Sequence, residues 1–110
     1  MLYKERFETV FDEEFKHQKD KNWIAILTIA RSILRGLVGE PIHLDSALDC
    51  DDHRLYLFFP DNNPYILTVD VFPDKVEIEY YHPLSDVGKK ERTFSSNQVN
   101  KIVKYIKKLY

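Results

Sequence analysis

The sequence has one cysteine, three glycines and no long apolar run, and each of these shortages excludes a class of protein. The lone Cys50 cannot form a disulfide within the chain. The scattered glycines Gly36, Gly39 and Gly88 cannot build a glycine-rich phosphate loop, which disfavours a nucleotide enzyme. The N-terminus lacks a basic and apolar leader, and no apolar stretch approaches the length of a bilayer span. We expect a cytoplasmic protein with no membrane segment and no cofactor.

The chain contains enough apolar residues to form one hydrophobic core. Of its 110 residues, 44% are hydrophobic, which suits a single domain and argues against disorder. No internal repeat, low-complexity tract or linker divides the sequence. We therefore expect one domain over residues 1–110.

Two amphipathic helices are predicted in the N-terminal part. Residues 3–19 place apolar side chains on one helical stripe and most of the acids away from it. Residues 23–38 carry a wider apolar stripe that ends before a glycine and a proline, and Asn22 is a reasonable N-cap. The apolar run at 23–29 could alone form a buried strand, but the periodicity continues through Leu37 and favours a helix.

The strongest pattern is a hairpin around the turn Phe72-Pro73-Asp74-Lys75. Proline cannot supply the positive φ of a two-residue hairpin turn, so a four-residue loop is favoured. Alternating apolar residues then determine the register, because a slip of one residue would bury Glu77 and Glu79. The predicted cross-strand pairs are Val71 with Val76, Asp70 with Glu77, Val69 with Ile78, Thr68 with Glu79, Leu67 with Tyr80 and Ile66 with Tyr81.

Two further strands and a last helix complete the predicted fold. Alternating apolar residues at 55–59 come before a cluster of turn formers at 60–64 and predict a strand, and residues 90–94 could form another. Ser95 and Gln98 match a capping box ahead of a C-terminal helix. The predicted class is α+β: two N-terminal helices, a three- or four-stranded antiparallel meander and a C-terminal helix in a two-layer sandwich.

The face of the predicted sheet that points away from the core combines rings with carboxylates. A purely solvated face would not need those rings, so we predict a partner-binding surface there. Asp70 opposite Glu77 costs roughly 0.2 to 1 kcal/mol unless a cation lies nearby. Arg92 is the internal candidate for that cation, and a basic protein partner is the external one. The predicted partner-binding residues are Tyr56, Phe58, Asp70, Glu77, Glu79 and Tyr81.

Charge is distributed unevenly along the chain. Residues 40–87 carry eleven acids against two bases, or −9, and residues 88–110 carry seven bases against one acid, or +6. The two blocks could neutralise each other, or each could form a solvated surface. We prefer a non-enzymatic interaction protein whose acidic and aromatic surface binds a basic protein partner, as an inhibitor, immunity or antitoxin-type protein would. A homodimer through the same rings stays open.

Two other functions compete with this hypothesis. Lys89, Lys90, Arg92 and the lysines of the last helix could form a basic stripe for nucleic acid, although the acidic middle of the chain would repel phosphates. The histidines and aspartates at 43–53 could bind a divalent metal and support a small hydrolase. Their spacing matches neither an EF-hand loop nor the paired-histidine helix of a zinc peptidase. We therefore assign no catalytic, metal-binding or cofactor-binding residue.

Overall fold

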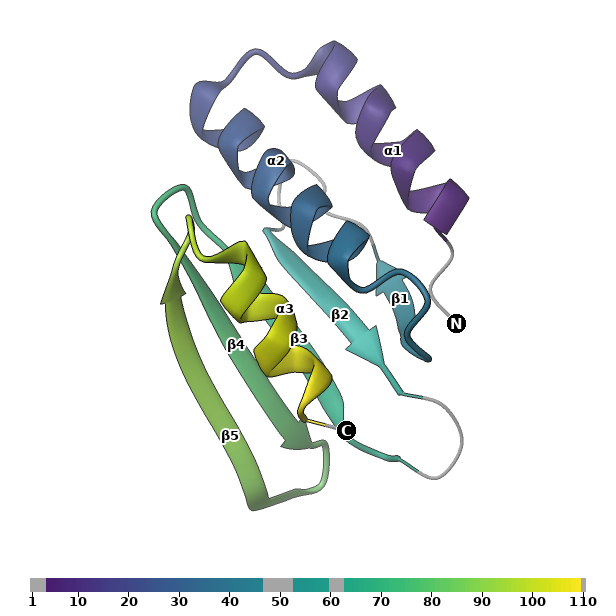
Figure 1. The fold of residues 1–110 in the computed structure, drawn as a ribbon, viewed down its shortest axis with the longest axis vertical. Helices are drawn as coiled ribbons and strands as arrows, with labels where there is room; N and C mark the ends of the chain where they lie inside the picture. Colours follow the sequence, from purple (N-terminus) through teal and green to yellow (C-terminus); the bar gives the residue numbers. More distant parts are fainter. Residues whose placement is uncertain (1–3, 47–52, 60–62, 110) are drawn as a thin grey trace.

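The fold is an α+β arrangement in which helices cover one face of an antiparallel sheet (Figure 1). The computed structural model describes residues 4–46, 53–59 and 63–109. Within these ranges the sheet has the strand order β1-β2-β3-β4-β5, and every neighbouring pair is antiparallel. The elements are α1 (Lys4–His17), α2 (Lys21–Gly36), β1 (His43–Ser46), β2 (Arg54–Phe58), β3 (Ile66–Val71), β4 (Lys75–His82), β5 (Ser85–Ser95) and α3 (Val99–Lys107).

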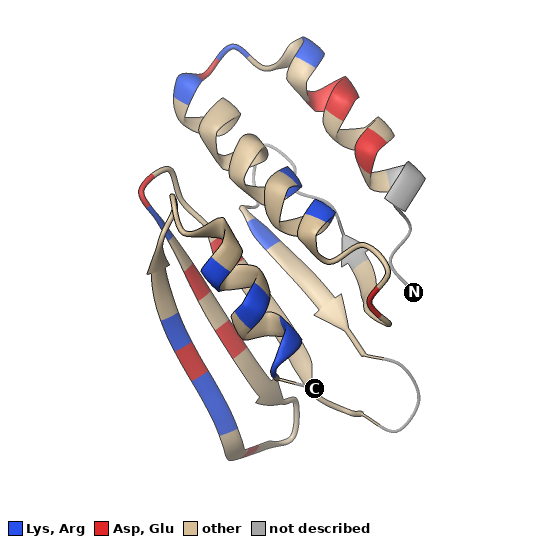
Figure 2. Cartoon of the chain, in the orientation of Figure 1, with Lys and Arg blue, Asp and Glu red and all other residues tan. Residues whose placement is uncertain are grey.

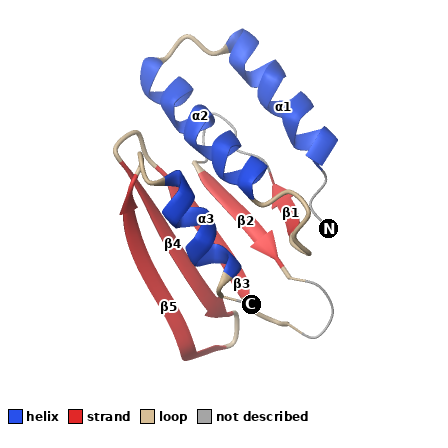
Figure 3. Ribbon diagram, viewed as in Figure 1, coloured by secondary structure: helices blue, strands red, loops and turns tan. Residues whose placement is uncertain are grey.

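The predicted class is confirmed, and the sheet is larger than predicted. Figure 3 shows the helices on one side of the sheet, as a layered α+β fold requires. The described part of the chain forms five strands rather than three or four. The unpredicted strand is β1, which includes His43 and Asp45 from the segment 43–53 that was considered as a metal site. Its four residues contain one apolar side chain, so β1 is defined by its pairing with β2 and not by a hydrophobic pattern.

One hydrophobic cluster joins the helices to the sheet. The strands contribute alternate residues, and the helices contribute the stripes that their periodicity predicts. Each large apolar side chain that is fully buried stabilises the fold by roughly 1.5 to 3 kcal/mol. The cluster includes Phe7 and Phe11 of α1, Ile26, Leu27, Ala30, Ile33 and Leu34 of α2, Leu55 and Leu57 of β2, Leu67, Val69 and Val71 of β3, Val76, Ile78 and Tyr80 of β4, Phe94 of β5, and Ile102, Val103 and Ile106 of α3.

The register of β3 against β4 is as predicted. All six predicted pairs are present, from Val71 opposite Val76 to Ile66 opposite Tyr81. The backbone N–H of Phe72 donates to the carbonyl of Lys75 at 2.9 Å and closes the loop between the strands. The burial of β4 alternates along the strand, so Glu77 and Glu79 lie on the side of the sheet away from the helices.

The strand predicted at 90–94 is part of the longer strand β5. It pairs with β4 from Lys75 opposite Ser95 to His82 opposite Ser85, with an irregularity between Tyr80 and His82. Along β5, Phe94 alone is buried. Strand β5 is an edge strand of the sheet, and most of its side chains are exposed. Its sequence therefore has almost no apolar alternation from which the strand could be predicted.

Both predicted helix caps are corrected by the structure. The N-cap of α2 is Asp20 and not Asn22: its carboxylate accepts from the N–H groups of Asn22 at 2.8 Å and Trp23 at 3.3 Å. A carboxylate is favoured there because its charge also complements the helix dipole. The capping box of Ser95 and Gln98 does not form, since α3 has no side-chain cap and Ser95 is still paired with β4.

No helix in the described ranges combines the length and the apolar character that crossing a membrane would require.

The contact between α2 and α3 depends on Gly36. A Cβ atom at this position would lie 2.6 Å from Cγ2 and 3.1 Å from Cγ1 of Val103, whose β-branched side chain is buried. We predict that Gly36→Ala lowers the free energy of unfolding by about 1 to 2 kcal/mol, because overpacking exceeds the gain in helix propensity. Urea unfolding should show a smaller loss when the same change is made in a Val103→Ala background. An equal loss in both backgrounds would show that the steric contact is not the cause.

Candidate functional site

The candidate site is the sheet surface opposite the helices, which we call the open face. Strand pairing arranges the side chains of this face in three rows that run across the strands. The row at one end is aromatic and aliphatic, and the row at the other end is mainly charged. All six residues predicted from the sequence lie on it. The row nearest the β2 C-terminus is Phe58, Ile66 and Tyr81, the middle row is Tyr56, Thr68, Glu79 and Glu91, and the third row is Arg54, Asp70, Glu77 and Thr93.

Arg54 forms an ion pair with Asp70. Its Nε donates to Oδ1 of Asp70 at 2.6 Å and its Nη2 to Oδ2 at 3.0 Å, which is a two-pronged guanidinium–carboxylate pair. Nη1 also donates to the hydroxyl of Tyr56 at 3.4 Å. The hydrogen bond with Asp70, followed by the one with Tyr56, raises the pKa of Arg54 above its ordinary value. This pair ties β2 to β3 and orients the Tyr56 ring.

The other acids of the open face meet two lysines. Lys75 lies 3.1 Å from Glu77. Lys89 bridges the carboxylates of Glu79 and Glu91, each at 2.9 Å, and its pKa is raised by the hydrogen bonds to Glu79 and then Glu91. These pairs are partly solvated, so screening by water leaves each of them a small contribution to stability.

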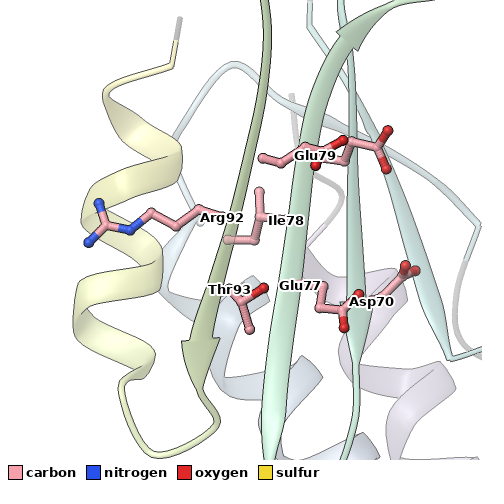
Figure 4. A pocket seen from close by; sticks show the side chains of 7 residues that line it. Asp70, Glu77, Ile78, Glu79, Arg92 and Thr93 are labelled. Atoms are coloured by element: carbon pink, nitrogen blue, oxygen red, sulfur yellow. The ribbon is translucent and has the colours of Figure 1, made fainter.

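Arg92 is not the cation of the open face, which corrects the sequence-based candidate. It pairs with Ile78, so strand alternation directs it to the helix side of the sheet. Figure 4 shows its side chain pointing towards α3, while Asp70, Glu77 and Glu79 point the opposite way. Its guanidinium carbon lies 4.7 Å from the ring centre of Phe94 and 5.4 Å from that of Tyr105.

A groove of about 140 Å³ runs between β4 and β5 on the open face (Figure 4). We call it the acidic groove. Its described lining includes four carboxylates and the hydroxyl-bearing Thr93, and Lys75 and Lys89 pair with acids towards its two ends. The carboxylates are those of Asp70, Glu77, Glu79 and Glu91.

Beside the acidic groove the surface becomes apolar. Phe58, Ile66 and Tyr81 lie in one cross-strand row, and each is partly exposed. Thr68, in the next row, is only 2% exposed, although it lies on a face that no helix covers. Its cross-strand neighbours are Tyr56 and Glu79. The larger side chains of these neighbours therefore cover Thr68 in the middle of the sheet.

Sequence reasoning missed the roles of Arg54 and Lys89. The position of Arg54 could have been found, because it shares the alternation of Tyr56 and Phe58 and faces Asp70 in the register. Lys89 could not, because its position depends on the hairpin between β4 and β5, which includes an irregularity of pairing.

The metal hypothesis rests mainly on residues 47–52, which lie outside the described residues. Of its histidines, His43 belongs to β1, and the ring of His53 lies 4.6 Å from that of Phe72. Within the described ranges, no three histidine, cysteine or acidic side chains form a group that could hold a metal ion.

Comparison of the chain with known proteins finds no matching family model, no matching curated protein and no matching solved structure.

The pair between Arg54 and Asp70 gives a test of the open-face electrostatics. Replacing Arg54 with methionine leaves Asp70, a largely buried acid with 15% side-chain exposure, opposite Glu77 without its guanidinium. We predict a loss of about 1.5 to 3 kcal/mol in the free energy of unfolding, the range for hydrogen bonds to charged groups. Urea unfolding measures this, and Asp70→Asn in the same chain should restore part of the loss.

The matched control is Lys75→Met, which removes a cation from a more exposed pair on the same face. It should cost less than about 1 kcal/mol. Equal losses in the two variants would contradict the special role of Arg54.

Proposed function

We propose that this chain is a non-enzymatic, cytosolic interaction protein whose open face binds a basic segment of a protein partner, in the manner of an inhibitor, immunity or antitoxin-type protein. The observation that supports this most directly is the acidic groove, which is lined by four carboxylates from β3, β4 and β5 on the sheet face opposite the helices. A groove of about 140 Å³ suits an inserted arginine or lysine side chain rather than a large ligand.

The charges already present in the groove favour exchange with a partner. Lys75 and Lys89 hold its acids through solvated contacts of 3.1 and 2.9 Å, which contribute little to stability. An arginine from a partner can bind a carboxylate with two parallel hydrogen bonds, whereas a lysine offers a single point charge. A guanidinium that enters between Glu77 and Glu79 therefore replaces weak internal pairs with stronger ones.

The apolar row supplies the second element of an interface. Protein interfaces commonly have aromatic anchors at their centre and a polar rim around them. Phe58, Ile66 and Tyr81 lie in the row beside Tyr56 and Glu79, so rings and carboxylates are neighbours on one surface. A partner that covers both would bury the rings and pair with the acids.

The test is affinity capture from the native host with wild type and a double variant, Glu77→Lys and Glu79→Lys. Both side chains are on the open face and partly exposed, at 43% for Glu77 and 37% for Glu79, so we expect the variant to fold, which circular dichroism will check. We expect wild-type protein to retain one or more basic proteins, identified by mass spectrometry, and the variant to lose them, because two repulsive charges now line the groove.

The matched control is Glu13→Lys with Glu14→Lys on α1, which makes the same change in net charge within the helix layer. The control should capture the same proteins as wild type. If the folded groove variant still captured them, or if the control lost them equally, the proposal would be wrong.

A further inference from the structure

A second groove lies on the helix side of the sheet, between α3 and β5. It has a volume of about 240 Å³, and we call it the basic groove. Among the described residues that line it, four are cations, two are aromatic and none is acidic. Figure 2 shows basic segments on α3 and on β5, with the acidic segments of β4 drawn between them. The lining residues are Arg92, Phe94, Lys101, Lys104, Tyr105 and Lys108.

The cations of the basic groove have no acidic partner among the described residues. In the ranges that the structure describes, no carboxylate lies within ion-pair distance of Arg92 or of the three lysines. The open face differs, because each of its four acids contacts a cation. A concave surface with four unpaired positive charges has a strong positive potential and favours an anion.

The side chain of Arg92 is held in a position that suits phosphate. Its guanidinium lies against the rings of Phe94 and Tyr105, at 4.7 and 5.4 Å from their centres. The two rings contact each other edge to face, with centres 5.6 Å apart. Stacking restricts the guanidinium while its in-plane N–H groups stay available, and these groups match two oxygens of a phosphate.

The lysines add a linear arrangement. Lys101, Lys104 and Lys108 are three and four residues apart, so they follow one side of α3 over about 10 Å. A row of charges along a groove fits a chain of regularly spaced anions better than one compact anion. The ring of Tyr105 and the outer plane of Arg92 offer surfaces on which a base can stack.

We infer that the basic groove binds single-stranded nucleic acid, with the lysines and Arg92 on successive phosphates and a base stacked at Tyr105. The groove is smaller than the roughly 300 to 1,000 Å³ of common ligand pockets, so a single strand can run along it but a duplex does not fit into it. An acidic peptide supplies negative charge but no base to stack.

The main objection from the sequence concerns the acids of the middle of the chain. In the structure, Asp70, Glu77, Glu79 and Glu91 lie on the open face, and the sheet separates them from the basic groove. A phosphate bound between β5 and α3 therefore contacts the unpaired cations without contacting these carboxylates. The inference concerns a different surface from the open face and does not depend on the proposed protein partner.

The experiment measures fluorescence anisotropy of labelled ten-nucleotide oligouridylate and oligothymidylate at 50 mM salt. We expect both strands to bind, and log K to fall with log salt with a slope of about −1.4 to −2, since two or three phosphates each contribute about −0.7. The variant Lys101→Gln, Lys104→Gln, Lys108→Gln should bind at least about tenfold more weakly and lose most of the salt dependence. All three side chains are exposed, so folding should be intact.

Two controls separate the groove from net charge. Lys16→Gln, Lys19→Gln, Lys21→Gln makes the same charge change around the α1–α2 connection and should bind within about twofold of wild type. Arg92→Lys keeps the charge but removes the two-pronged donor, so it should weaken binding several-fold with a similar salt slope.

Several results would overturn the inference. No binding of either strand by wild type at 50 mM salt would do so, as would an equal loss in the α1–α2 control. Equal affinity for a duplex of the same length would exclude a single-strand site. Equal affinity for polyglutamate would assign the groove to acidic proteins instead.

Discussion

The alternation of side chains across the β3–β4 hairpin is the constraint on which the rest of the structure depends. Because side chains change sides at every residue, the pairing of Val71 with Val76 determines the side of every other residue in both strands. It places Val69 and Ile78 in the core and Asp70 and Glu77 on the open face. The same alternation continues into β2 and β5, so one register decides which charges can meet and which cannot.

The sequence predicts this part of the fold well for a physical reason. A slip of one residue would bury carboxylates, and the large cost of burying an unpaired charge leaves a single register. The helices are predictable because each has to bury a continuous stripe. The strands β1 and β5 lack such a signal: β1 has one apolar residue in four, and β5 buries Phe94 alone. Edge strands are specified by hydrogen bonds with a neighbour, and backbone hydrogen bonds leave no pattern in the side chains.

The candidate site is predictable only where the β3–β4 register determines it. The six residues that the sequence predicts to bind a partner share a face because the register fixes that face, but the ion pairs of the acids depend on how far side chains reach across strands. Arg54 meets Asp70 directly opposite on the neighbouring strand, whereas Lys89 reaches Glu79 and Glu91 from within the irregular stretch of pairing between β4 and β5. The sequence-based candidate was Arg92, because it lies in the segment 90–94 that could add a further strand to the predicted sheet. Arg92 pairs with Ile78, so its side chain lies on the helix side of the sheet. Only the register between β4 and β5 could show this.

The sheet also explains why the uneven charge of the chain cancels only in part among the described residues, through pairs such as Lys89 with Glu79. Ion pairs require contact within about 4 Å, and beyond roughly 8 to 10 Å salt screens what attraction is left. Arg92 and its neighbours on α3 lie on one side of the sheet and Glu77 and Glu79 on the other, so the backbone and the core layer keep them apart. Glu91 and Arg92 are consecutive in sequence, yet alternation directs them to opposite sides. Charges that would neutralise each other in a flexible chain thus become two separate surfaces, an acidic one with internal lysines and a basic one whose described cations are unpaired.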